Sequence, residues 1–105
     1  MLFRKRNTNI MGHSWTEFQI ISVWNKGIPI SGYDIKKYRK DIYGSLMEFD
    51  KYGVNDDLGW EIDHIKPVIH CGSDVFSNLQ PLQWGNNYNK GNHWPNWLYT
   101  MKVAN

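Results

Sequence analysis

The chain has 105 residues and a formal net charge of +2, and this length predicts a single domain. Cys71 is the only cysteine, which excludes an intrachain disulfide and a four-cysteine zinc site. No apolar run approaches the roughly 20 residues of a membrane-spanning helix, and residues 1–6 lack the apolar core of a signal peptide, so we expect a cytoplasmic protein with no membrane partner.

Charge is distributed unevenly along the chain. Residues 1–40 contain eight Lys or Arg and two acidic residues, whereas residues 41–63 contain seven acidic residues and Lys51 as the one cation. A basic part beside an acidic part is typical of an enzyme that binds phosphates and holds a cation, and solvated surface charge explains the pattern equally well. The six tryptophans favour packing in the core over a surface that stacks bases.

The N-terminal half is expected to be helical beyond a short arm. Residues 1–13 are predicted to form a flexible basic arm. The cations of this arm are Arg4, Lys5 and Arg6. A capping box at Ser14 and Glu17 predicts the start of a helix that ends at Gly27. A second, short helix is predicted from Asp34 to about Asp41.

From Ser45 the pattern changes to strands followed by two helices. Strands are expected over residues 46–49, 60–63 and 79–83, because their side chains alternate and turn residues separate them. A helix is expected from Gly85 to Lys90, and a last helix is expected to begin at Pro95. The sequence therefore predicts one α+β domain over residues 14–105, in which a helical N-terminal half packs on a strand–strand–helix unit.

Three sequence blocks lie in register within this predicted unit. They are GWEIDHIKP (residues 59–67), NLQPL (78–82) and NNYNK (86–90), and they place His64, Asn78 and Asn87 at spacings of fourteen and nine residues. This order resembles the HNH endonuclease family, and looser similarity to small bacterial and phage HNH proteins extends back to Trp24. The resemblance implies a ββα-metal fold whose core spans about residues 58–92. Many family members carry two Cys-x-x-Cys pairs; here Gln83 and Asn86 stand at the second pair, so we expect no structural zinc.

The resemblance assigns the central roles of the site. His64 would be the general base, and an imidazole with a pKa near 6.5 suits that task at neutral pH. Asp63 and Asn87 would be the metal ligands, although the namesake pattern has histidine at the position of Asn87. Two oxygen ligands favour one Mg²⁺ or Mn²⁺ ion over Zn²⁺. The alternative for Asn87 is a helix-capping or exposed amide, and for His64 a structural or exposed imidazole.

Further residues are expected to support the site or to bind phosphate. Asn78 is expected to hold the loop near the catalytic histidine, with an ordinary Asx turn as the alternative. Lys90 follows Asn87 by three residues, so its ammonium is expected to meet a phosphate oxygen from the same helix face. Lys66 and His70 would act likewise from the loop or would be solvated. Glu61 is expected to lie behind the metal site or to face outward.

Arg39 and Asp41 match a Tyr-Arg-Lys-Asp block of the small bacterial relatives. An internal ion pair that fixes the second helix to the hairpin is predicted here in preference to a DNA contact.

The resemblance and the charge pattern together predict a metal-dependent endonuclease that cleaves or nicks DNA, with RNA as an alternative substrate. Arg4, Lys5, Arg6, Lys66, His70 and Lys90 are the candidate nucleic-acid contacts. The alternative is an accessory module that binds nucleic acid on an HNH scaffold with little catalysis, and a structural or inhibitor protein is a third class. No helix-turn-helix follows the unit, so a protein partner is expected to supply any specificity.

Overall fold

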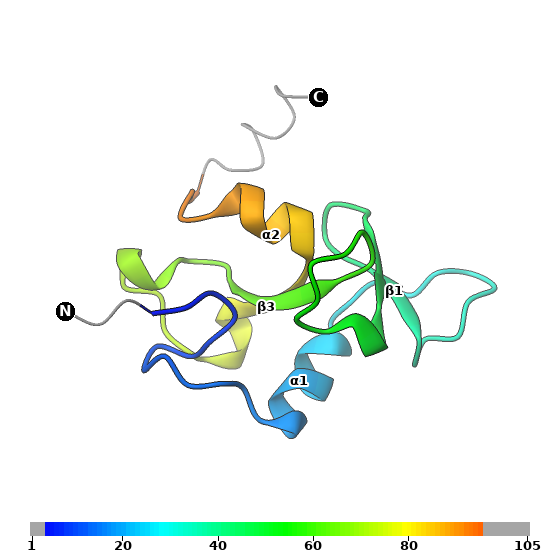
Figure 1. The fold of residues 1–105 in the computed structure, drawn as a ribbon, viewed down its shortest axis with the longest axis horizontal. Helices are drawn as coiled ribbons and strands as arrows, with labels where there is room; N and C mark the ends of the chain where they lie inside the picture. The colour runs from blue at the N-terminus through cyan, green and yellow to red at the C-terminus, as the bar shows by residue number, and fades with distance from the viewer. Residues whose placement is uncertain (1–3, 96–105) are drawn as a thin grey trace.

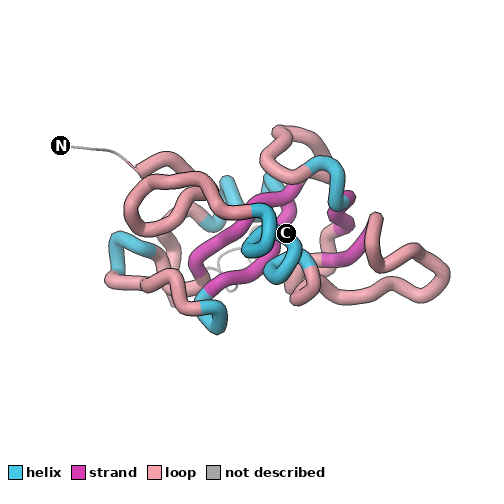
Figure 2. Tube along the Cα trace, turned by 90° about the horizontal axis from the view of Figure 1, so that it is seen from below, coloured by secondary structure: helices cyan, strands magenta, loops and turns pink. Residues whose placement is uncertain are grey.

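The computed structural model describes residues 4–95, which form an α+β domain with two helices and two small antiparallel sheets (Figure 1). The elements are, in order, α1 (Glu17–Trp24), β1 (Tyr38–Lys40), β2 (Leu46–Glu48), the 3-10 turn η1 (Phe49–Lys51), β3 (Trp60–His64), the 3-10 turns η2 (Val68–His70) and η3 (Phe76–Asn78), β4 (Leu79–Gln83) and α2 (Trp84–Lys90). Long loops surround the central β3–β4 hairpin (Figure 2).

The β3–β4 hairpin is the centre of the domain. Its register runs from Trp60 opposite Gln83 to His64 opposite Leu79. The predicted strand over residues 79–83 is confirmed, the predicted strand at 60–63 continues to His64, and α2 begins one residue before the predicted Gly85. α1 packs against β4 from one side, and α2 packs against β3 and β4 from the other (Figure 1).

An aromatic cluster fills the core between α1 and the sheets. The rings of Trp24 and Trp60 lie 5.0 Å apart, and both side chains are buried together with Met47. Each indole N–H finds a carbonyl, because Trp24 donates to Ile35 O and Trp60 donates to Phe49 O, both at 3.1 Å. Buried indoles with satisfied N–H groups contribute large apolar area without a desolvation penalty.

The predicted capping box is shifted by two residues. Thr16 is the N-cap residue: its hydroxyl accepts from Gln19 N at 3.2 Å, and Gln19 Oε1 accepts from Thr16 N at 2.9 Å. The prediction of Ser14 and Glu17 is therefore wrong. Trp15 explains the shift, because its buried ring lies outside the helix and Thr16 is the first residue after it that can cap.

The second predicted helix is also wrong. Asp34 starts a single turn, in which its carboxylate accepts from Lys36 N and its carbonyl accepts from Tyr38 N. The chain then becomes the strand β1, since residues 38–40 pair with β2 on one edge and Lys40 pairs with Ile28 on the other. Tertiary pairing of the backbone has overridden a local helix signal.

The expected ion pair between Arg39 and Asp41 does not form. The guanidinium of Arg39 is buried and donates to backbone carbonyls, including Ile35 O at 3.0 Å and Gly27 O at 2.9 Å. Arg39 lies within β1 whereas Asp41 follows its last residue, and the two side chains have separate partners. The opposite charges of Arg39 and Asp41 suggested an ion pair, but packing gives each side chain its own hydrogen-bond partners.

Asp41 instead joins the first hairpin to α2. Its buried carboxylate accepts from Tyr43 N and Ser45 N through Oδ1, and from Gln83 N and Asn86 Nδ2 through Oδ2. Four N–H donors therefore satisfy this buried carboxylate, and no cation is needed beside it. Asp41 thereby fixes the start of α2, the helix that carries Asn87.

The helix expected from Pro95 lies outside the described residues. Within the described residues, no helix is long and apolar enough to cross a bilayer.

Candidate active site

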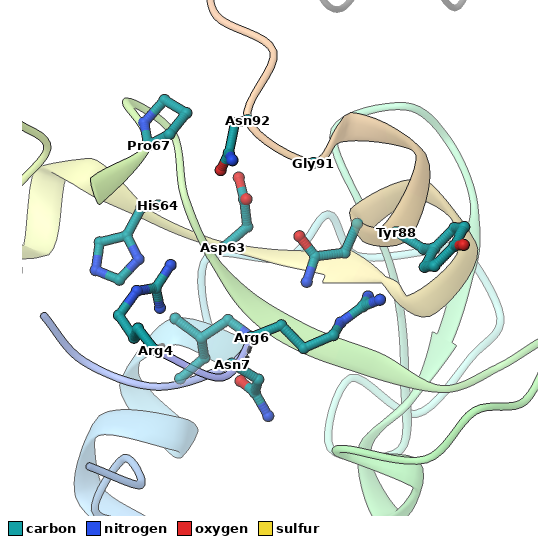
Figure 3. A pocket seen from close by; sticks show the side chains of 11 residues that line it. Arg4, Arg6, Asn7, Asp63, His64, Pro67, Tyr88, Gly91 and Asn92 are labelled. Atoms are coloured by element: carbon teal, nitrogen blue, oxygen red, sulfur yellow. Dashed lines mark hydrogen bonds between the residues drawn. The ribbon is translucent and has the colours of Figure 1, made fainter. Parts of the chain in front are cut away.

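A polar cavity of about 200 Å³ lies where β3, α2 and the N-terminal segment meet (Figure 3). Asp63 and His64 line it from β3, Asn87 and Tyr88 line it from α2, and the N-terminal segment adds Arg4, Arg6 and Asn7. The structure therefore brings together the predicted base, both predicted metal ligands and two of the predicted phosphate contacts.

Asp63 and His64 reach one cavity although successive strand residues point to opposite faces. β3 pairs with β4 along one edge, and its other edge pairs with Tyr52 at Trp60 and meets the N-terminal segment at Ile62. The side chain of Asn7 closes that edge, because its Oδ1 accepts from Ile62 N at 2.9 Å and from the hydroxyl of Tyr52 at 3.0 Å. A cavity at a strand edge can be lined from both faces of the strand.

His64 is held by a carboxylate that the sequence did not single out. The imidazole is 4% exposed, and its Nε2 lies 2.8 Å from Asp74 Oδ1. With the proton on Nε2, Nδ1 carries the lone pair and is the basic atom. Asp74 also accepts from Ile10 N at 3.2 Å, and the Trp15 ring lies 5.6 Å from the imidazole. The sequence signal that could have found this carboxylate is the Ser73-Asp74 pair in the loop between β3 and β4.

Asp63 is buried against the end of α2. Its Oδ1 lies 3.2 Å from Lys90 Nζ, and its Oδ2 accepts from Gln80 Nε2 at 2.9 Å. Burial raises the pKa of the Asp63 carboxyl above its ordinary value, while Lys90 and Gln80 oppose that rise.

Lys90 does not face phosphate in this arrangement. Its side chain is 4% exposed, and the ammonium also donates to His64 O at 3.1 Å. Lys90 was expected to contact phosphate, but in the structure its ammonium pairs with the Asp63 carboxylate. The spacing of three residues placed Lys90 on the face of Asn87 but could not show that this face is buried at the helix end.

Asn87 is oriented by a buried carboxylate. Its Nδ2 donates to Glu61 Oε1 at 2.8 Å, and the same oxygen lies 2.6 Å from Arg6 Nη2. Because the amide nitrogen is engaged with Glu61, Oδ1 is the atom left for a ligand, and it accepts no hydrogen bond from the described residues. Of the two positions expected for Glu61, behind the site or outward, the structure shows the first: Glu61 is buried.

The N-terminal segment is part of the site in its described residues. The arm was expected to be flexible, but Arg6, Asn7 and Ile10 form hydrogen bonds with Glu61, Ile62 and Asp74 respectively. The side chain of Arg4 points toward His64 and Asp63 (Figure 3). Burial lowers the pKa of Arg4, and the charges of Asp74 and Asp63 raise it. A run of basic residues gave no sign that these backbone and side-chain anchors exist.

Asn78 lies at the end of η3 and fastens the loop between β3 and β4. Its Oδ1 accepts from Lys66 N at 2.8 Å, and its Nδ2 donates to Lys66 O and to Ser73 O. These bonds close the loop that carries Asp74 toward His64. The expected loop-holding geometry is present, and Asn78 is not among the residues that line the cavity.

The remaining predicted phosphate contacts do not line the cavity. Lys5 is exposed. Lys66 Nζ lies 5.3 Å from the centre of the Trp94 ring, and the imidazole of His70 lies 6.3 Å from the same ring. These two residues form a separate basic and aromatic group beside the loop.

The donor set bears on whether the site suits a metal ion. Among the described residues, no three His, Cys, Asp or Glu side chains gather as a metal cluster. Asp63 retains one lone pair on each oxygen beyond its bonds to Lys90 and Gln80, and Asn87 offers Oδ1. One carboxylate and one amide oxygen fit a hard cation that takes its other ligands from water and phosphate.

Comparisons with known proteins add no relative. No protein-family model matches the chain, and no curated protein or solved structure matches it.

Proposed function

We propose that the protein is a metal-dependent endonuclease that hydrolyses phosphodiester bonds in DNA, built on the ββα-metal fold of the HNH family. The observation that carries the proposal is the convergence of Asp63, His64 and Asn87 on one cavity that two arginines also line. Asp63 and His64 are adjacent on β3, Asn87 comes from α2 further along the chain, and the resemblance gave the three residues complementary roles. The unit β3–loop–β4–α2 has the order of elements that the family requires.

His64 is the general base of the proposed reaction. Nδ1 accepts a proton from a water molecule. Asp74 accepts a hydrogen bond from Nε2–H and so stabilises the imidazolium that results. The ring is buried against Trp15 and bonded to Asp74, so it loses little orientational entropy when it adopts the reactive geometry.

Arg4 and the ligand pair support the charge that develops on phosphate. The guanidinium of Arg4 donates to Thr8 O at 2.8 Å, which holds it at the cavity beside His64 (Figure 3). Its remaining N–H groups can bind the phosphate oxygens. Asp63 and Asn87 Oδ1 would hold one Mg²⁺ or Mn²⁺ ion, which supplies further positive charge at the phosphate and the leaving oxygen. Burial raises the pKa of Asp63, and the charge of Lys90 opposes that rise and so favours the ionised form that can bind a cation.

The test is cleavage of supercoiled plasmid in the presence of Mg²⁺ or Mn²⁺. The proposal predicts conversion to the nicked circle, abolished by chelator and restored by added metal. Zn²⁺ is expected to support the reaction poorly, because the ligands are oxygens. Full activity in chelator would contradict the metal-dependent mechanism, and no activity with any divalent ion would contradict the enzyme.

One observation favours the alternative of a binding module without catalysis. Both oxygens of Asp63 already accept hydrogen bonds, so the carboxylate is satisfied without a metal. A module of this kind would bind DNA with a strong salt dependence and leave the plasmid supercoiled.

A further inference from the structure

The cavity has an aromatic rim formed by α2. Tyr88 follows Asn87, lines the cavity and is 64% exposed. Its ring lies parallel to that of Trp84, with 5.5 Å between centroids and 9° between planes. Within the described residues, the ring contacts of Tyr88 are with Trp84 and with the guanidinium of Arg6.

Two neighbouring side chains, Trp84 and Arg6, contact this ring. Arg6 Cζ lies 4.8 Å from the Trp84 centroid and 5.5 Å from the Tyr88 centroid, and the same guanidinium is fixed by the buried Glu61. Trp84, Arg6 and Glu61 therefore set the plane of the Tyr88 ring. A ring that stacks on Trp84 and is still 64% exposed offers a surface for a further planar group.

The neighbouring charges indicate which planar group would bind there. Arg4 and Arg6 line the same cavity as Tyr88, so the surroundings favour a polyanion. Nucleobases stack on aromatic side chains irrespective of sequence, because every base has a π-face. A strand whose phosphate lies beside His64 and Arg4 brings an adjoining base to the rim.

A base inside a duplex cannot use this surface. Both of its faces are covered by neighbouring base pairs, and exposing one costs unstacking energy, whereas an unpaired base has a face available.

We propose that Tyr88 is a stacking surface for an unpaired nucleobase, and that the site takes single-stranded or flap-bearing nucleic acid in preference to intact duplex. This inference rests on the proposed function and names the substrate class of the same site.

Binding in chelator tests the inference without any need for cleavage. Three fluorescein-labelled probes of about 12 nucleotides would be titrated by anisotropy: a single strand, an abasic strand of the same charge, and a perfect duplex. Tyr88→Leu should weaken binding to the base-bearing strand at least about fivefold, while Tyr88→Phe stays within about twofold of the parent. Neither variant should change binding to the abasic strand or the duplex. Tyr33→Leu is the matched control, because Tyr33 is an exposed tyrosine that packs on Tyr38 away from the cavity.

Two results would overturn the inference. One is a Tyr88→Leu variant that binds the base-bearing strand as tightly as the parent does. The other is an equal loss on the abasic strand, which would show that the ring does not contact a base. A parent protein that binds as predicted but nicks no substrate with any divalent ion would contradict the proposed function alone. A parent that nicks, with Tyr88→Leu unchanged on single strands, would contradict the inference alone.

Discussion

Lys90 Nζ lies 3.2 Å from Asp63 Oδ1, and both side chains are almost fully buried. The pair joins the end of α2 to the end of β3, and the same ammonium donates to His64 O. A single lysine therefore fixes the relative positions of the proposed ligand and the backbone of the proposed base.

Lys90→Met should strongly destabilise the fold. The change leaves the Asp63 carboxylate buried without a cation, and breaking a buried pair from one side costs about 3–5 kcal/mol. Urea unfolding would measure it, with Lys36→Met as an exposed control. The double variant Asp63→Asn/Lys90→Met should lose less than the sum of its single changes. A Lys90→Met protein as stable as the parent would show that the pair is not coupled.

Glu61→Gln should reduce turnover more than it reduces stability. Glu61 Oε1 accepts from Asn87 Nδ2 and pairs with Arg6, so the neutral amide weakens both contacts and frees Asn87 to rotate. Loss of such a supporting contact typically lowers metal affinity or activity about 10–100-fold. The fall should appear in kcat and in the Mg²⁺ concentration needed for half-maximal rate. Glu17→Gln, on the exposed first turn of α1, is the control. Equal Mg²⁺ requirements in Glu61→Gln and the parent would remove Glu61 from the site.

Arg4 and Arg6 should differ in their effects. Arg4→Gln should weaken DNA binding and reduce the slope of log K against log salt by about 0.9, with an unchanged melting temperature. Arg6→Gln should lower the melting temperature, because it removes the partner of the buried Glu61. Lys5→Gln, next to both but outside the cavity, is the control. If Arg4→Gln leaves the salt slope unchanged, Arg4 does not bind phosphate.

Stability should decrease in alkali because of Tyr52. Burial raises the pKa of Tyr52 from 10.0 to about 12, and its hydroxyl donates to Asn7 Oδ1. The folded state therefore keeps a proton that the unfolded state releases, so this contribution is complete below pH 10 and is lost as the pH rises toward 12. Urea midpoints between pH 9 and 12 should fall less steeply for Tyr52→Phe than for the parent. Identical slopes would show that Tyr52 does not titrate with unfolding.

The hairpin and α2 could be predicted from sequence because their signals are local. Alternating side chains mark β3 and β4, and the resemblance to the HNH family covers the same stretch. β1 could not be predicted, because its residues form a strand only by pairing with Ile28 and with β2. These partners are separated from β1 in the sequence. The second helix was read from Asp34, a residue that caps a single turn equally well.

The candidate site shows the same division. The resemblance to the HNH family named His64, Asp63 and Asn87 as candidates, and the structure places all three at one cavity. The groups that orient them do not, because Asp74, Glu61 and Asn7 act through tertiary contacts with no fixed spacing. Lys90 was predicted to contact phosphate, because helix periodicity gives the face on which a residue lies and not how deeply it is buried.

The plasmid-nicking rate of His64→Ala tests the central claim most directly. His13→Ala is the matched control, since His13 is exposed and does not line the cavity. With Mg²⁺ present, loss of the base should slow nicking by about 10²–10⁴-fold, while His13→Ala nicks at the parent rate. A His64→Ala protein that nicks as fast as His13→Ala would contradict the account.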